Sequence, residues 1–220
     1  MAATAAILGL WAAFGATHMG LSNSRLRPAL VERLGEKGFV AVYSLIALAT
    51  FIPLVSVYFG AKHSGPKLWY LGGIPGARWL AYAGIGVAFA MMVAGLVRSS
   101  PSSLVPGEAN PTGVFRITRH PVFMGVGLLG LLHLLVVPIH AAELAFFGGL
   151  PFFSVIGCHH QDRRKLVSLG EGFRSFHDRT PFLPGTRRGA LRGVAEQPIP
   201  MLIGLAVAAV LRHYHSSLFG

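Results

Sequence analysis

The amino-acid sequence predicts an all-α protein, a polytopic bundle of transmembrane helices. Hydrophobic residues make up 53% of the 220 residues and charged residues only 12%, whereas about a quarter of a soluble domain is charged. The charged residues are gathered between long apolar stretches, which is typical of membrane spans and their loops. Residues 1–220 are expected to form a single transmembrane domain, because no repeat of fixed period divides them.

Six segments are close to the length of about 20 apolar residues that a helix needs to cross a membrane. They are residues 3–21, 39–59, 79–97, 121–139, 141–158 and 200–215. The first lacks the basic n-region of a cleaved signal, so we interpret it as a span. The fourth and fifth are joined by a short turn near Pro138 and are expected to form an antiparallel hairpin. The sixth is the weakest, which leaves five spans as an alternative.

The distribution of basic residues predicts the orientation of the bundle. Fifteen Lys and Arg residues lie in the connections 22–38, 98–120 and 159–199, and four lie in the remaining connections and the C-terminal segment. Cytoplasmic loops are the ones enriched in Lys and Arg, so we expect a multi-pass protein of the bacterial inner membrane with its N-terminus outside. The net charge of +11 suits the anionic headgroups of the lipid bilayer; nucleic acid is not expected as a partner, because no binding module for it is recognisable.

Two connections have the pattern of helices that lie flat in the membrane interface. Leu26, Leu30 and Leu34 recur every four residues with basic residues between them, which is the spacing of one helix face. A second apolar face runs from Leu166 to Phe176 behind a cluster of basic residues. The sequence therefore predicts two interfacial amphipathic helices in addition to the spans.

Two histidines in apolar segments are candidate functional residues, because ionisable groups inside a bilayer are costly. His18 follows an uninterrupted apolar run, and His133 lies in the middle of a segment with no other ionisable residue. A neutral imidazole there needs a hydrogen-bond partner, a metal or a water-filled cavity. The alternative for each is a structural role between helices. His140 and Glu143, near the turn at the outer side, are interpreted as interfacial polar residues.

A second group of candidates precedes the fourth predicted span. Arg116, Arg119 and His120 come just before Pro121, a residue suited to the first turn of a helix. Basic groups at a helix N-terminus can hold an anion such as a phosphate or a carboxylate; an anchor for lipid headgroups is the alternative. The polar residues 159–164 are expected at the surface. Hydrolase motifs such as a Ser-His-Asp order or His-Glu-x-x-His are absent from the sequence.

In the order of these motifs, the chain resembles the NnrU family and its plastid relatives, the 15-cis-zeta-carotene isomerases. The matching residues are His18, Leu26–Pro28, Arg116–Pro121, His133, Asp162–Arg164, Gly170-Glu171, Arg179-Thr180 and Pro184. This order extends over about 170 residues, roughly from Phe14 to Pro184, which makes it more specific than any one of the motifs.

The resemblance implies a cofactor and a class of substrate. In the carotene isomerases histidines of the membrane helices bind haem b, and the positions that match those ligands are His18 and His133. Arg116, Arg119 and His120 would then order the cytoplasmic rim of the haem site. The isomerases have a cysteine three residues before the second histidine, whereas this chain has Gly130, which puts a redox-driven exchange of ligands in doubt. An apolar polyene or a small gas would be the substrate.

Three readings of function follow from these resemblances. The first is a haem-dependent, isomerase-like enzyme. The second is a non-catalytic membrane scaffold or sensor, because bacterial NnrU proteins are associated with denitrification and nitric oxide metabolism. The third reading is an S-adenosylmethionine-dependent methyltransferase, because Arg119-His120-Pro121 and Thr180–Pro184 resemble segments of the isoprenylcysteine and phospholipid methyltransferases. The paired glutamates of those enzymes are replaced here by Gln161-Asp162.

Overall fold

The computed structural model describes residues 2–103, 107 and 110–219. Its helices are α1 (Ala2–Leu21), α2 (Leu26–Gly60), α3 (Ala77–Val97), the 3-10 helix η1 (Gly113–Arg116), α4 (Pro121–Val136), α5 (Ala141–Leu169), α6 (Glu171–Arg179), α7 (Ala190–Glu196), α8 (Pro198–His213) and α9 (His215–Phe219). Two short strands, β1 (Lys67–Trp69) and β2 (Ile139–His140), pair antiparallel.

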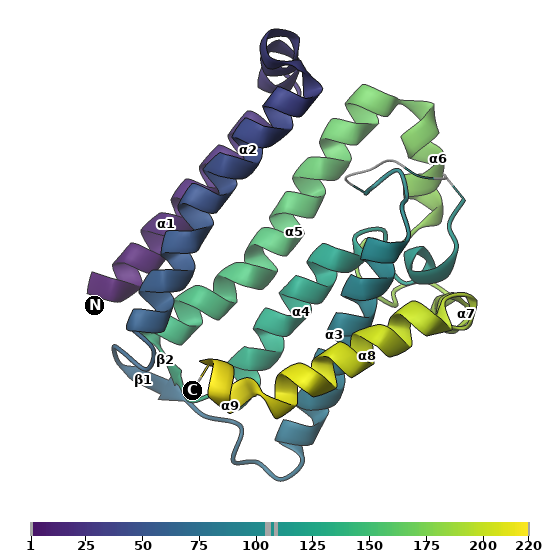
Figure 1. Ribbon diagram of the computed structural model, residues 1–220. Coiled ribbons are helices and arrows are strands. Elements are labelled where there is room, and N and C mark those ends of the chain that lie inside the picture. The colour runs from purple at the N-terminus through teal and green to yellow at the C-terminus, as the bar shows by residue number, and fades with distance from the viewer. Residues whose placement is uncertain (1, 104–106, 108–109, 220) are drawn as a thin grey trace.

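The long helices form a row in which each packs against the next, in the order α2, α1, α5, α4, α3 and α8 (Figure 1). Four of the six predicted spans (3–21, 39–59, 79–97 and 141–158) lie within these helices, whereas 121–139 and 200–215 extend past the ends of α4 and α8; α4 and α5 form the predicted hairpin. α5 lies near the middle of the row and contacts both α1 and α4. The all-α fold class predicted from the sequence is therefore confirmed.

The outer surface of the row is apolar, as a lipid environment requires. Large side chains such as Trp79, Leu80 and Leu96 are mostly exposed. Four helices (α1, α2, α3 and α5) are long and apolar enough to cross a membrane by themselves. α4 has only 16 residues, and α7 and α8 would make a fifth span only as a pair bent by 92°. The chain is therefore a membrane protein, with four or five such spans in the described structure.

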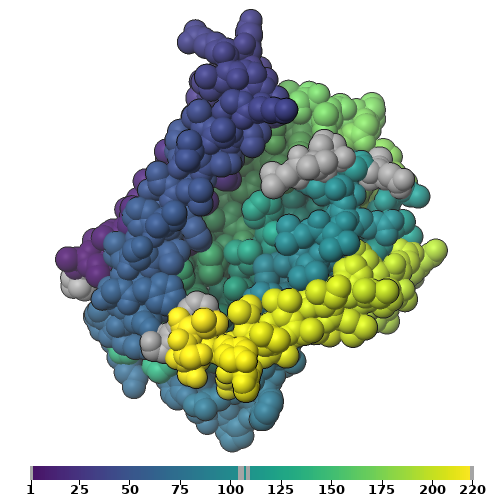
Figure 2. Space-filling model, viewed as in Figure 1, coloured from purple at the N-terminus to yellow at the C-terminus, as the bar shows by residue number. Residues whose placement is uncertain are grey.

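The two predicted interfacial helices have different boundaries in the structure. Residues 26–34 are helical, but at Gly35 (φ 71°) they bend away from the rest of α2, and Figure 2 shows this end projecting beyond the bundle. The predicted second helix is divided, because α5 continues to Leu169 instead of ending at residue 158. Gly170, with φ 54°, ends α5, and only α6 forms a separate helix. Glycine adopts such positive φ values without the clash of a Cβ atom.

Glycines allow the closest approaches between helices. A Cβ atom on Gly130 of α4 would lie 2.6 Å from the carbonyl oxygen of Phe147 on α5. A Cβ on Gly204 of α8 would lie 2.5 Å from the backbone of Ala90 on α3. Small residues at such crossings are the usual way in which membrane helices pack, since lipid removes the hydrophobic drive between them.

Candidate functional site

A buried polar cluster joins α4, α5 and the segment after α6. Asp162 of α5 accepts a hydrogen bond from Nε of Arg119 at 2.8 Å through Oδ2 and another from Nε2 of His120 at 2.8 Å through Oδ1. The side chains of Asp162 and His120 are 4% and 1% exposed. Arg119 and His120 directly precede α4, and Pro121 begins the helix, so both basic residues are presented at its N-terminus.

The cluster is held by the residues that follow α6. The guanidinium of Arg119 donates to the carbonyl of Thr180 at 3.0 Å and lies over the ring of Phe182, 5.1 Å from its centroid. The backbone N–H of Arg119 donates to the carbonyl of Pro181 at 2.9 Å. Burial lowers the pKa of His120 more than its hydrogen bond to Asp162 raises it. The imidazole is therefore neutral at pH 7, and Arg119 supplies the positive charge that the carboxylate needs.

This polar cluster borders a pocket of about 270 Å³ between α3, α4 and α5. Arg119, His120, Gln161 and three serines are its polar lining residues, and Leu96 and Phe115 are among its apolar residues. The buried Oε1 atom of Gln161 has no hydrogen-bond partner among the residues described. The pocket therefore suits the polar end of an amphipathic molecule, and the neutral imidazole in its wall can accept a proton.

The three residues predicted to hold an anion are divided between two places. Arg119 and His120 meet at Asp162, whereas Nε of Arg116 donates to Glu196 of α7 at 2.9 Å. This hydrogen bond, together with one from the backbone N–H of Gly113, lowers the pKa of Glu196 to about 2. Both arginines are thus paired with carboxylates of the protein.

The two histidines predicted from the membrane spans have separate surroundings. His18 lies between the rings of Phe14 and Tyr43, at centroid distances of 5.0 and 4.6 Å, and its Nδ1 is buried with no hydrogen-bond partner in the described structure. The ring of His133 stacks on Phe147 at 4.6 Å, and its Nδ1 donates to the carbonyl of Leu129 at 2.8 Å.

The expected position of His133 in the middle of its span is wrong, because α4 ends at Val136 and His133 lies in its last turn. The preceding turn of the same helix accepts the hydrogen bond of its Nδ1, so this N–H is satisfied within α4. Neither His133 nor His18 lines the pocket beside Arg119 and His120.

The helices also keep His18 and His133 apart along α5. Phe14, one turn before His18, contacts Phe153, whereas His133 contacts Phe147. The Oγ atom of Ser22, one turn after His18, lies 3.3 Å from Nε2 of His160 on α5. At 1.5 Å per residue, His18 is therefore roughly 9–20 Å further along α5 than His133. A haem shared by this pair would have to bridge this offset, because one iron needs both ring nitrogens within bonding distance. Haem binding by the chain stays a prediction, which the absorption spectrum of the purified protein would test.

A second pocket, of about 530 Å³, lies between α1 and α5 and was missed from the sequence. Its wall contains Trp11 of α1 stacked on Phe153 of α5 at 4.8 Å; Gly148 leaves open space in the lining, and Gly149 lets the Trp11 ring pack directly against α5. Exposed apolar side chains such as Phe152 lie at its edge, so the pocket opens toward the lipid. The signal available in the sequence was the Gly-Gly pair between aromatic residues of a membrane span.

The comparisons with known proteins point to one family. The family model described as NnrU protein matches residues 6–220. The chain is 28% identical over 182 residues to the chloroplastic 15-cis-zeta-carotene isomerase of Arabidopsis thaliana, which covers 81% of this chain and 49% of that protein. It is 25% identical over 174 residues to the chloroplastic enzyme of the same name from Zea mays, covering 78% of this chain and 47% of the relative.

The chain thus spans about half the length of the curated relatives that it matches. No solved structure matches it. The comparisons do not show the second resemblance, to the membrane methyltransferases.

Proposed function

Because the chain belongs to the NnrU family, we propose that it is a membrane-bound isomerase that changes the cis–trans geometry of double bonds in a long apolar polyene. The observation that carries this proposal is the similarity to two 15-cis-zeta-carotene isomerases over about four fifths of the chain. A carotene-like polyene has no polar group, so its binding site must be apolar and reachable from the lipid.

The pocket between α1 and α5 has these properties. Its lining is apolar except for Thr4 and the indole N–H of Trp11, and stacked Trp11 and Phe153 offer flat surfaces against which a conjugated chain can lie. We assign the polyene to this pocket, with Gly148 facing the bound chain. Denitrification and nitric oxide chemistry are not part of this proposal.

The activity can be tested with purified protein in liposomes that contain 15-cis-zeta-carotene, kept in the dark because light also isomerises polyenes. The cis and trans forms are separated by chromatography and measured by their absorption. We expect conversion well above that of protein-free liposomes. Equal rates in the two samples would contradict the proposed function.

A glycine exchange tests the pocket. In Gly148→Leu the new side chain has room at its Cβ, whose nearest atom is Leu144 Cδ1 at 3.8 Å, and it fills the pocket. We expect the rate of isomerisation to fall at least about tenfold, which corresponds to about 1.4 kcal/mol of free energy. Gly157→Leu, on the same helix at a position with no atom within 4 Å, is the matched control and should keep the parent rate. Equal rates in both variants would place the substrate elsewhere.

We also propose that both termini lie outside the cytoplasm of a bacterial cell. The excess of Lys and Arg in residues 22–38, 98–120 and 159–199 supports this orientation. An alkaline phosphatase fused after Gly220 should be active, since the enzyme works only outside, whereas a green fluorescent protein fused after Arg188 should fluoresce inside. A fluorescent fusion after Gly220 would contradict the orientation and support five spans.

A further inference from the structure

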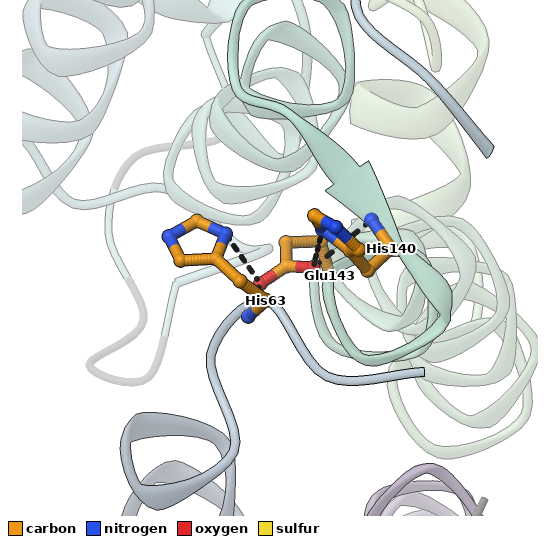
Figure 3. A group of neighbouring side chains, drawn as sticks. All are labelled: His63, His140 and Glu143. Carbon is orange, nitrogen blue, oxygen red and sulfur yellow. Dashed lines mark hydrogen bonds and ion pairs between the residues drawn. The ribbon is translucent and has the colours of Figure 1, made fainter. Parts of the chain in front are cut away.

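A second cluster of ligand-type side chains lies at the opposite end of the bundle from Asp162. His63 follows α2, His140 ends β2 and directly precedes α5, and Glu143 lies in the first turn of α5. The pairing of β1 with β2 brings the loop after α2 next to His140. Figure 3 shows the carboxylate of Glu143 between the two imidazole rings.

The geometry of these three side chains is that of a small ligand set. Nδ1 of His63 lies 3.5 Å from Oε1 of Glu143, and Nδ1 of His140 lies 3.5 Å from Oε2. One ligand atom from each residue lies within 4.8 Å of the other two. The ring centroids of the histidines are 5.7 Å apart, so both rings face the same carboxylate.

The backbone around the cluster supports this arrangement. The carboxylate of Glu143 is fully buried and accepts hydrogen bonds from the backbone N–H of His63 at 2.7 Å and of His140 at 3.0 Å. His63 has a φ of 59°, a left-handed conformation that non-glycine residues rarely adopt. The side chain of His140 and the backbone of Glu143 form a capping box at the start of α5.

We propose that His63, His140 and Glu143 form a binding site for a divalent metal ion of the zinc class. Two imidazole nitrogens and one carboxylate oxygen are ligands that Zn²⁺ takes at about 2.0–2.2 Å, with a fourth position left for water. The positive ion would compensate the buried charge of Glu143, and the side chain of His63, which is 57% exposed, gives it a route from solvent. Ca²⁺ and Mg²⁺ prefer oxygen ligands alone. The bound ion would connect the loop after α2 to the start of α5.

Zinc binding can be measured on the full chain in nanodiscs, purified without a polyhistidine tag and freed of metal with EDTA. ZnCl₂ is titrated against a fluorescent zinc indicator. We expect one ion per chain, and His63→Ala should weaken binding by at least about tenfold, a loss seen even for groups one step removed from a ligand. His213→Ala, at an exposed histidine of α8, is the control and should bind zinc as the parent does.

His63→Ala carries the test, because its ring is exposed and its loss leaves the two backbone hydrogen bonds of Glu143 in place. X-ray absorption of the zinc-loaded parent should show two imidazoles in its coordination shell. Equal zinc affinity in the parent and in His63→Ala would overturn the proposal. An affinity of the parent for Ca²⁺ as high as its affinity for Zn²⁺ would also overturn it.

Discussion

Asp162→Ala is expected to destabilise the protein by about 3–5 kcal/mol, the cost of breaking a buried ion pair by removing one partner. The variant would leave Arg119 buried without its carboxylate, and His120 would lose its hydrogen-bond acceptor. Arg119 also holds the carbonyl of Thr180, so the segment after α6 should loosen together with the contact between α4 and α5. The effect should therefore extend beyond the substituted residue.

The measurement is equilibrium unfolding of the purified protein in mixed micelles, followed by circular dichroism. Asp178→Ala is the matched control, because this carboxylate is mostly exposed and its contribution should be within about 0.5 kcal/mol of zero. A second variant, Asp162→Asn, keeps one acceptor oxygen and should lie between the two. If Asp162→Ala unfolds like the control, the cluster does not stabilise the fold.

Gly130→Cys is expected to destabilise the pairing of α4 and α5 by about 1–3 kcal/mol, the usual cost of overpacking. The cysteine is the residue that the resemblance to the carotene isomerases places at this position. In this chain a Cβ atom there would lie 2.6 Å from the carbonyl oxygen of Phe147 and 2.9 Å from Pro151. Since Pro151 has no N–H to donate to the carbonyl four residues earlier, this oxygen is left for the close approach of Gly130.

The unfolding free energies of Gly130→Cys and Gly9→Cys separate this packing effect from the effect of adding a cysteine. Gly9 of α1 has no atom within 4 Å of a Cβ built on it, so its replacement should not destabilise the protein. Gly130→Ala should already be destabilised, because the clash begins at Cβ. Parent-like stability of Gly130→Ala would show that the two helices can separate at little cost.

The sequence was sufficient to predict the apolar helices, because lipid requires each crossing segment to be apolar and to satisfy its own backbone hydrogen bonds, but only four or five spans of the six predicted are long and apolar enough to cross a membrane in the described structure. The helix ends were less predictable. α4 ends at Val136, before the chain turns into β2, and this places His133 near an end instead of in the middle. The stop of α5 at Gly170 depends on a positive φ value, which a glycine permits but does not require.

The candidate sites were only partly predictable, for a related reason. Arg119 and His120 were identified from their place before a helix, but their partner Asp162 lies 42 or more positions away in the sequence. Periodicity describes one helix at a time and does not show which helices become neighbours. The same limit applies to His63, whose meeting with His140 and Glu143 depends on the pairing of β1 and β2.

The position of α5 has a mechanical consequence. Glu143 lies in its first turn and Asp162 near its other end, 19 residues or about 28 Å apart at 1.5 Å per residue. One helix therefore carries a buried carboxylate toward each of its ends, with Pro151 between them. Because both carboxylates belong to the same helix, a shift of α5 along its axis would move both polar clusters together.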